Sequence, residues 1–176
     1  MEEFMKKSLI IVLIILVSLP SLFSQSLIEL SRDNKTEEVL AMLRSGIKDT
    51  QDELGWNGLL WACKNENVIL VKEFLKYGSD PCAYTSNSRQ FPLLIAARFN
   101  KGSEIIKILL STKAIAQINT FGHDGMTPLI AAAKNNNLDV CILLIKNGAL
   151  KYLKSEEGYY AWEYSNIPEI QDLLKP

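Results

Sequence analysis

The stretch HDGMTPLIAAAKNNNLDVCILLIKNGA, residues 123–149, contains the only histidine of the chain. A glycine and a two-residue turn lead into an apolar segment with small residues, and a Lys-Asn-x-Asn link leads into a second apolar segment. The second segment ends at the Gly148-Ala149 pair. If this stretch were unique, its histidine would suggest a catalytic or ligand site. If it recurs along the chain, it is a unit of a scaffold.

The same pattern recurs in four other segments of the chain. They are LIELSRDNKTEEVLAMLRSGI (27–47), LGWNGLLWACKNENVILVKEFLKYGSD (54–80), SRQFPLLIAARFNKGSEIIKILLSTKA (88–114) and EEGYYAWEYSNIPEIQDLL (156–174). The equivalent positions, spaced 32, 34, 36 and 33 residues apart, are Leu30, Ala62, Ala96, Ala132 and Ser165. A single unit of this size cannot bury its apolar faces, so its stability comes from stacking on its neighbours.

The repeat resembles the ankyrin repeat, which has a period of about 33 residues and the signature Thr-Pro-Leu-His-x-Ala. The signature is best matched by TPLIAA, residues 127–132, with Asp-Gly before it and Asn-Gly-Ala after the second segment. The resemblance implies an all-α solenoid of stacked helix-turn-helix units with short β-hairpin-like turns. The expected units are residues 25–53, 54–86, 87–121, 122–154 and 155–176.

Residues at the expected helix boundaries fit this fold. Pro92 and Pro128 stand at the first turn of a helix, where the missing N–H of proline costs nothing. Gly78 and Gly148 suit a left-handed helix C-cap. The second segment of each unit carries apolar residues at i, i+3 and i+4, the pattern of a helix with one buried face.

The chain departs from the ankyrin signature in two ways. The signature His is replaced by Leu60, Leu94 and Ile130, so we expect apolar packing where that His would form hydrogen bonds. The closing Gly of the third unit is replaced by Lys113, and the loop that follows is longer than in the other units. We therefore expect an irregular hairpin around residues 113–124.

Residues 1–24 have the composition of a leader. Lysines precede an apolar run over residues 9–17, and small residues follow Pro20, which is the order found in a secretory signal peptide. We expect cleavage after Ser24. The alternative is an uncleaved membrane anchor, although spanning a bilayer takes about 20 apolar residues. In both cases the repeats are expected to be exported, to a bacterial periplasm or to the extracellular space, and only an uncleaved leader would bring a membrane contact.

Composition excludes several function classes. The chain has 176 residues and a net charge of −1, with 48% hydrophobic and 22% charged residues, which fits one folded domain. Nucleic-acid binding would require a clustered excess of Lys and Arg, and the near-neutral net charge argues against it. With one His, no C-x-x-C and no phosphate-cradling glycine loop, we expect no metal, cofactor or small-molecule substrate.

The chain has three cysteines, and an odd number cannot all pair internally. Cys63 and Cys141 lie within apolar helical patterns, where a free cysteine acts as a small hydrophobic residue. Cys82 follows a proline in a turn and is expected to be the most exposed.

No enzymatic site is evident. His123 would need a nucleophile or a substrate groove around it to act as a general base, and the sequence shows neither. We therefore interpret His123 as an exposed turn residue, with a catalytic or pH-sensing role as the less favoured alternative.

The resemblance implies a concave binding face built from the turn tips and from the exposed side of each first helix. The candidate partner-binding residues are Leu54, Trp56, Asn65, Gln90, Phe99, His123, Met126, Asn135 and Tyr159. Trp56, Phe99, Met126 and Tyr159 matter most in this set, because aromatic residues and Met are enriched at interfaces. Trp56 and Tyr159 could equally pack on adjacent turns, and for Phe99 burial is favoured. Trp61 and Trp162 are expected to face the core.

Two functions remain open. The first is an exported module that captures one protein of unknown identity through its concave face, as an accessory or as an inhibitor or immunity-type protein. The second is a protein that protects against oxidative stress through an exposed Cys82 thiol. The second hypothesis has the weakness that no basic residue lies close to Cys82 in sequence.

Overall fold

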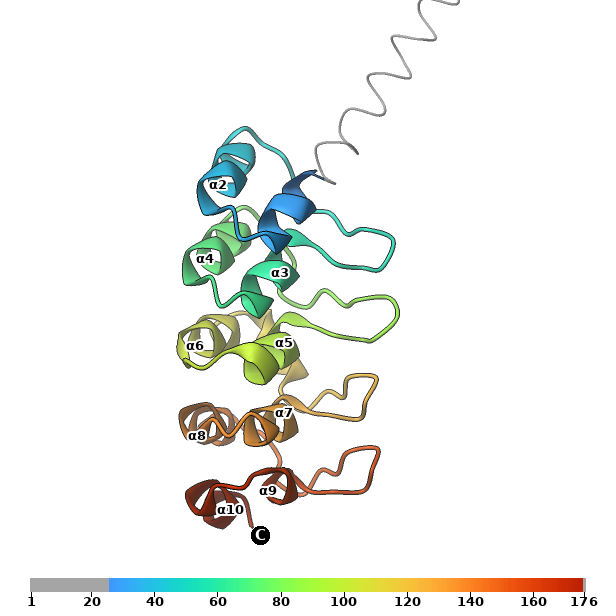
Figure 1. Ribbon diagram of the computed structural model, residues 1–176, viewed down its shortest axis with the longest axis vertical. Helices are drawn as coiled ribbons and strands as arrows, with labels where there is room; N and C mark the ends of the chain where they lie inside the picture. The colour runs from blue at the N-terminus through green and yellow to red at the C-terminus, as the bar shows by residue number, and fades with distance from the viewer. Residues whose placement is uncertain (1–25, 176) are drawn as a thin grey trace, which may run out of the picture.

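The computed structural model describes residues 26–175, which form two parallel columns of helices with loops projecting from one side (Figure 1). The first helices of the repeats, here called inner helices, are residues 26–32, α3 (Gly58–Lys64), α5 (Pro92–Phe99), α7 (Pro128–Lys134) and α9 (Ala161–Tyr164). The second, outer helices are α2 (Thr36–Arg44), α4 (Val68–Lys76), α6 (Glu104–Leu110), α8 (Leu138–Lys146) and α10 (Pro168–Leu174). The expected all-α solenoid is confirmed.

The expected leader, residues 1–24, lies outside the described residues. Within residues 26–175, none of the helices has both the length and the apolar character needed to cross a membrane.

Side chains at the helix starts explain where the inner helices begin. Pro92 and Pro128 occupy the first turns of α5 and α7, as predicted. Thr127 caps α7 by accepting a hydrogen bond from the Ile130 N–H, and Asn57 caps α3 in the same way although it replaces the signature Thr. An asparagine oxygen therefore substitutes for the threonine hydroxyl at this position.

The core lies between the two columns of helices. Leu60, Leu94 and Ile130, which replace the signature His, are at most 1% exposed, so the expected apolar packing is confirmed. Ala96 and Ala132 are fully buried where successive inner helices meet. Small side chains at these positions allow the helices to pack closely, and the stack buries what one unit would leave exposed.

The hairpin loops carry little β structure. Each is closed by one backbone hydrogen bond of 2.8 to 3.0 Å, between Asp52 N and Trp56 O, Thr85 N and Gln90 O, Gly122 N and Met126 O, and Ser155 N and Tyr159 O. Successive hairpins also bond to each other, because Ser86 N donates to Leu54 O and His123 N donates to Ser88 O. The hairpins therefore stack in register with the helices.

Gly125 is required at the tip of the third of these hairpins, which belongs to the fourth repeat. Its φ is +65°, in the left-handed region, and a Cβ there would collide with the backbone of Glu156 in the next hairpin. Gly78 and Gly148 end α4 and α8 with φ of +90° and +97°, which confirms the predicted C-caps.

The junction after α6 is irregular, but not in the predicted form of an irregular hairpin: the hairpin is closed by the bond from Gly122 N to Met126 O like the others, and the extra residues precede it. A 3₁₀ helix, η1 (Lys113–Gln117), fills the longer loop, and Thr112 caps it through the Ala114 N–H. Ala114 is fully buried, and Gln117 Nε2 donates to Cys82 O in the preceding repeat at 3.1 Å. The extra residues thus add to the core and hold neighbouring repeats together.

Candidate partner-binding face

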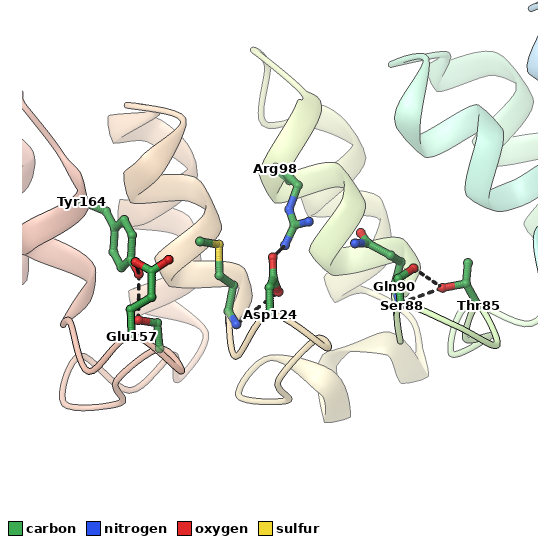
Figure 2. Close-up of polar contacts among 9 residues, drawn as sticks. Thr85, Ser88, Gln90, Arg98, Asp124, Glu157 and Tyr164 are labelled. Atoms are coloured by element: carbon green, nitrogen blue, oxygen red, sulfur yellow. Dashed lines mark hydrogen bonds and ion pairs between the residues drawn. The ribbon is translucent and has the colours of Figure 1, made fainter.

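Side chains of the inner helices and of the hairpin loops reach each other along one side of the stack, here called the inner face. Its residues are Leu54, Trp56, Trp61, Lys64, Arg98, Phe99, Asp124, Lys134, Glu157, Tyr159 and Tyr164. Contacts between helix and hairpin recur from repeat to repeat, and Figure 2 shows several of them.

An aromatic cluster occupies the inner face at the second and third repeats. The rings of Trp56 and Trp61 stack with centroids 4.4 Å apart and an interplanar angle of 29°. Lys64 Nζ lies 5.4 Å and 4.7 Å from the centroids of these rings and 5.6 Å from that of Phe99. The ammonium is therefore in cation–π range of all of them.

The structure corrects the predictions for Trp61 and Phe99 in this cluster. Trp61 was expected to face the core, but Leu60, Ala62 and Cys63 take the core-facing positions of α3 and leave its ring partly exposed toward the hairpin. Trp162 is half-buried and packs against the core, as expected.

Phe99 was expected to be buried but is 46% exposed. The reason lies in the next residue: Asn100 leaves the helix in an extended conformation, becomes fully buried and donates from Nδ2 to Cys63 O at 2.7 Å. Because Asn100 takes the inward position, Phe99 is left on the surface.

A pocket lies next to this cluster, between the third and fourth repeats. Its volume is about 260 Å³, and it is lined by Arg98, Asp124, Met126, Ala131, Lys134 and Asn135. Arg98 Nη2 and Asp124 Oδ2 form an ion pair across the repeat boundary at 2.5 Å (Figure 2). Met126, expected to project as an exposed anchor, is only 5% exposed and packs against the core instead, so that expectation was wrong.

Two tyrosines lie on the inner face at the last repeat. The rings of Tyr159 and Tyr164 meet edge to face at 5.9 Å, and Tyr159 is 49% exposed. The Tyr164 hydroxyl bonds to Ser155 Oγ at 2.7 Å and to Glu157 Oε2 at 3.0 Å (Figure 2). Burial, with a smaller contribution from the nearby Glu157, raises the pKa of Tyr164. The phenol therefore stays protonated, and it can donate to the Glu157 carboxylate.

The amides of Asn65 and Asn135 are bound to neighbouring repeats. Asn65 Nδ2 donates to Ser31 O at 3.0 Å and to Arg32 O at 3.1 Å, and Asn135 Nδ2 donates to Asn100 O at 3.1 Å. Both residues were candidates for partner binding, and their geometry instead gives them a role in stacking. The Lys-Asn-x-Asn link was visible in the sequence, but the carbonyls that it binds are more than 30 residues away.

The other asparagine of each link has two roles at once. Asn67 Oδ1 accepts from Leu70 N at the start of α4, while its Nδ2 donates to Asn34 Oδ1 and Thr36 Oγ1 in the first repeat. Asn137 caps α8 and donates to Lys101 O in the same manner. Sequence reasoning missed these residues.

The remaining candidates lie in the hairpins. Leu54 is 53% exposed, and the His123 side chain is exposed at its turn. Gln90 is half-buried, and its backbone N–H donates to Thr85 Oγ1 at 2.9 Å (Figure 2). These three residues form the rim of the inner face rather than its centre.

The cysteines are all unpaired, and Cys63 and Cys141 are buried. Burial raises the pKa of Cys141 to about 12. The pKa of Cys82 is also raised, first by desolvation and then by the Asp80 carboxylate, while Lys113 opposes the shift. Lys113 Nζ pairs with Asp80 Oδ1 at 3.0 Å, so the nearest cation is largely neutralised. Within residues 26–175, no cluster of His, Cys, Asp and Glu is suited to holding a metal ion.

Comparisons with known proteins agree with this architecture. The family model described as ankyrin repeats (3 copies) matches residues 27–120 and 59–155. The chain is 35% identical over 121 residues to an ankyrin repeat protein of fowlpox virus (strain NVSL), which covers 66% of this chain and 35% of the viral protein.

Two longer proteins are also similar over part of their length. The ARF GTPase-activating protein Git of Drosophila melanogaster is 30% identical over 54% of this chain and 14% of its own length. The human transient receptor potential cation channel subfamily A member 1 is 27% identical over 71% of this chain and 11% of its own length. The chain thus spans about a third or less of these relatives. On the family match and the stacked two-helix repeats, the chain belongs to the ankyrin repeat family, whose repeats generally mediate interactions between proteins.

Proposed function

We propose that this chain is an exported module that captures one partner protein through its inner face, as an accessory or inhibitor-type protein. The observation that carries the proposal is the cluster of Trp56, Trp61 and Phe99, which is partly exposed beside a pocket. A few large aromatic residues supply most of the binding energy of an interface when a partner covers them. Tyr159 extends this surface to the last repeat.

The export part of the proposal rests on the leader. Residues 1–24 carry the charged, apolar and small-residue order of a signal peptide, and the repeats follow directly. Mass spectrometry of the protein purified from its native envelope fraction tests this part. A mature N-terminus at or near Gln25 supports export, and an intact N-terminus in a cytoplasmic fraction contradicts it.

The alternative function, redox protection through Cys82, is disfavoured by the chemistry around the thiol. A reactive cysteine needs a lowered pKa, whereas desolvation and Asp80 raise the pKa of Cys82. A Cys82→Ser variant is expected to capture the partner as well as the parent chain does. Loss of capture in this variant would favour the alternative.

Capture of a partner from envelope extract tests the binding function. A Trp56→Ala/Phe99→Ala/Tyr159→Ala variant removes the exposed rings of Phe99 and Tyr159 and the half-buried ring of Trp56, which packs against the core. The matched control is Ile69→Ala/Tyr77→Ala, which removes exposed apolar side chains of α4, an outer helix, and of its C-terminal cap. A protein that is captured by the parent chain and by the control, but lost with the inner-face variant, supports the proposal. Equal capture by both variants overturns the assignment of the inner face.

A further inference from the structure

The inner face carries one cation at equivalent positions of the second, third and fourth repeats. Lys64, Arg98 and Lys134 each lie in the last turn of an inner helix. Each reaches the following repeat: Lys64 Nζ lies 5.6 Å from the Phe99 ring centroid, Arg98 pairs with Asp124, and Lys134 Nζ lies 5.4 Å from the Tyr164 ring centroid. The cations therefore form a column that follows the stack.

The column retains unneutralised positive charge. Among the ion pairs that the structure shows within residues 26–175, none involves Lys64 or Lys134, whose ammonium groups face aromatic rings instead. The exposed Lys134 ammonium lies over one ring, which leaves its other N–H donors available to a carboxylate, whereas Lys64 is half-buried among three rings and keeps fewer free donors. Asp124, which pairs with Arg98, is 40% exposed at its side chain and remains open to exchange.

The pocket between the third and fourth repeats fits the side chain of a glutamate. Met126 and Ala131 supply apolar surface for methylene groups, while Arg98 and Lys134 supply the charge for a carboxylate. Charge-assisted hydrogen bonds from Arg and Lys to carboxylates are among the stronger contacts in proteins. The lining therefore suits a group that is apolar along its stem and anionic at its end.

Resting on the proposed function, we propose that the partner presents an extended acidic segment with a carboxylate at every third residue. Packed helices lie about 8–10 Å apart, so successive cations of the column are separated by about that distance. A segment in the polyproline II conformation has three residues per turn and rises about 3.1 Å per residue, so every third side chain lies on the same side and about 9 Å from the next. Carboxylates at i, i+3 and i+6 then meet Lys64, Arg98 and Lys134 in turn.

Cations also stabilise helix C-termini, which is a structural explanation for the same residues. The outer helices of the same repeats provide the matched control, because Lys76, Lys107 and Lys146 lie in their last turns. A triple substitution there removes the same number of charges from helix ends on the opposite side of the stack.

Fluorescence anisotropy with the purified full chain and labelled peptides at low salt tests the proposal. The probe is Ser-Glu-Ser-Ser-Glu-Ser-Ser-Glu-Ser, and the spacing control is Ser-Ser-Ser-Glu-Glu-Glu-Ser-Ser-Ser, which has the same composition. The spaced peptide should bind more tightly than the control peptide. The Lys64→Gln/Arg98→Gln/Lys134→Gln variant should bind the spaced peptide at least about tenfold more weakly, since each exposed ion pair contributes a factor of about two to five to affinity. The Lys76→Gln/Lys107→Gln/Lys146→Gln variant should change the affinity for the spaced peptide by less than about twofold.

Three outcomes would overturn the acidic-segment proposal: equal binding of both peptides, equal loss in both triple variants, or tighter binding of an oligouridine of similar length. If neither peptide binds while capture of a protein still depends on Trp56, Phe99 and Tyr159, the acidic segment is wrong and the binding function stands. If capture does not depend on those residues either, both proposals fail.

Discussion

Arg98, in the last turn of α5, is held by Asp124 in the hairpin of the next repeat, with Nη2 and Oδ2 2.5 Å apart. This pair ties the third repeat to the fourth at the edge of the pocket. It also sets the charge that the pocket offers, because Asp124 cancels much of the Arg98 charge while the Lys134 ammonium remains beside it. One ion pair therefore bears on both the joining of two repeats and the charge of the pocket.

Asp124→Asn should separate these two effects. The variant keeps a side-chain oxygen for the Met126 N–H, which Asp124 Oδ1 now accepts at 3.3 Å, but it releases the Arg98 guanidinium. We expect a loss of about 0.5–1 kcal/mol in the free energy of unfolding, measured by urea titration. Binding of the spaced acidic peptide should become about two- to fivefold tighter. Weaker peptide binding would show that Asp124 positions Arg98 rather than competing for it.

Asn65→Ala should destabilise the stack more than Asn135→Ala. Asn65 supplies both side-chain hydrogen bonds to the carbonyls of Ser31 and Arg32, whereas the carbonyl that Asn135 binds, Asn100 O, also accepts from Asn137. In urea unfolding, we expect Asn65→Ala to lower the free energy of unfolding by about 1–3 kcal/mol and Asn135→Ala by about half of that. Asn147→Ala is the control, because Asn147 Nδ2 donates only within its own helix, to Leu143 O. The reverse order of the first two variants would contradict the role given to Asn65.

Gly125→Ala should lower the stability of the fold more than Gly158→Ala does. Both glycines have positive φ, at +65° and +86°, so both variants pay a left-handed backbone penalty of about 1–2 kcal/mol. Only the Cβ at position 125 collides with the backbone of the next hairpin, at Glu156, while nothing lies within 4 Å of a Cβ at position 158. Thermal unfolding should show the larger loss at Gly125, and equal losses would mean that the hairpins are not packed against each other in solution.

Asp49 should make the contribution of its carboxyl group to stability decrease as the pH rises. Its carboxylate accepts from Gly58 N at 2.7 Å and Leu59 N at 3.3 Å, and burial raises its pKa despite these bonds. A carboxyl whose folded pKa is raised above its unfolded value contributes stability at low pH, and that contribution is lost as the pH rises through the folded pKa.

The Asp49→Asn variant removes this titration while it keeps an oxygen for the Gly58 N–H. Urea unfolding of both proteins between about pH 3 and pH 7 should show the variant gaining stability relative to the parent chain as the pH rises. A relative loss with rising pH would mean that the ionised form is the one favoured by folding.

Much of the fold could be predicted from local sequence because its determinants are local. Pro92 and Pro128 start helices through their own fixed φ, and Gly78 and Gly148 end helices through their own freedom at positive φ. The period of the repeat depends only on distances along the chain. Replacement of the closing glycine by Lys113 likewise predicted the irregular junction where η1 is found.

The composition of the inner face was less predictable because it depends on how neighbouring repeats meet. Phe99 is exposed because Asn100 binds a carbonyl in the preceding repeat, and Met126 is buried because it lies at the base of its hairpin, directly before the cap of α7. The sequence around Asn65 is compatible with partner binding and with stacking alike. Only the position of Ser31 O shows that Asn65 joins two repeats.

The sequence by itself determined the repeat, the helices and the all-α class, since periodicity and helix capping act within one unit. The tertiary structure decided which side chains lie on the inner face, which amides join the repeats, and that Lys64, Arg98 and Lys134 form one column. The physical reason is that these features arise from contacts between residues about one repeat apart, and stacking alone brings those residues together.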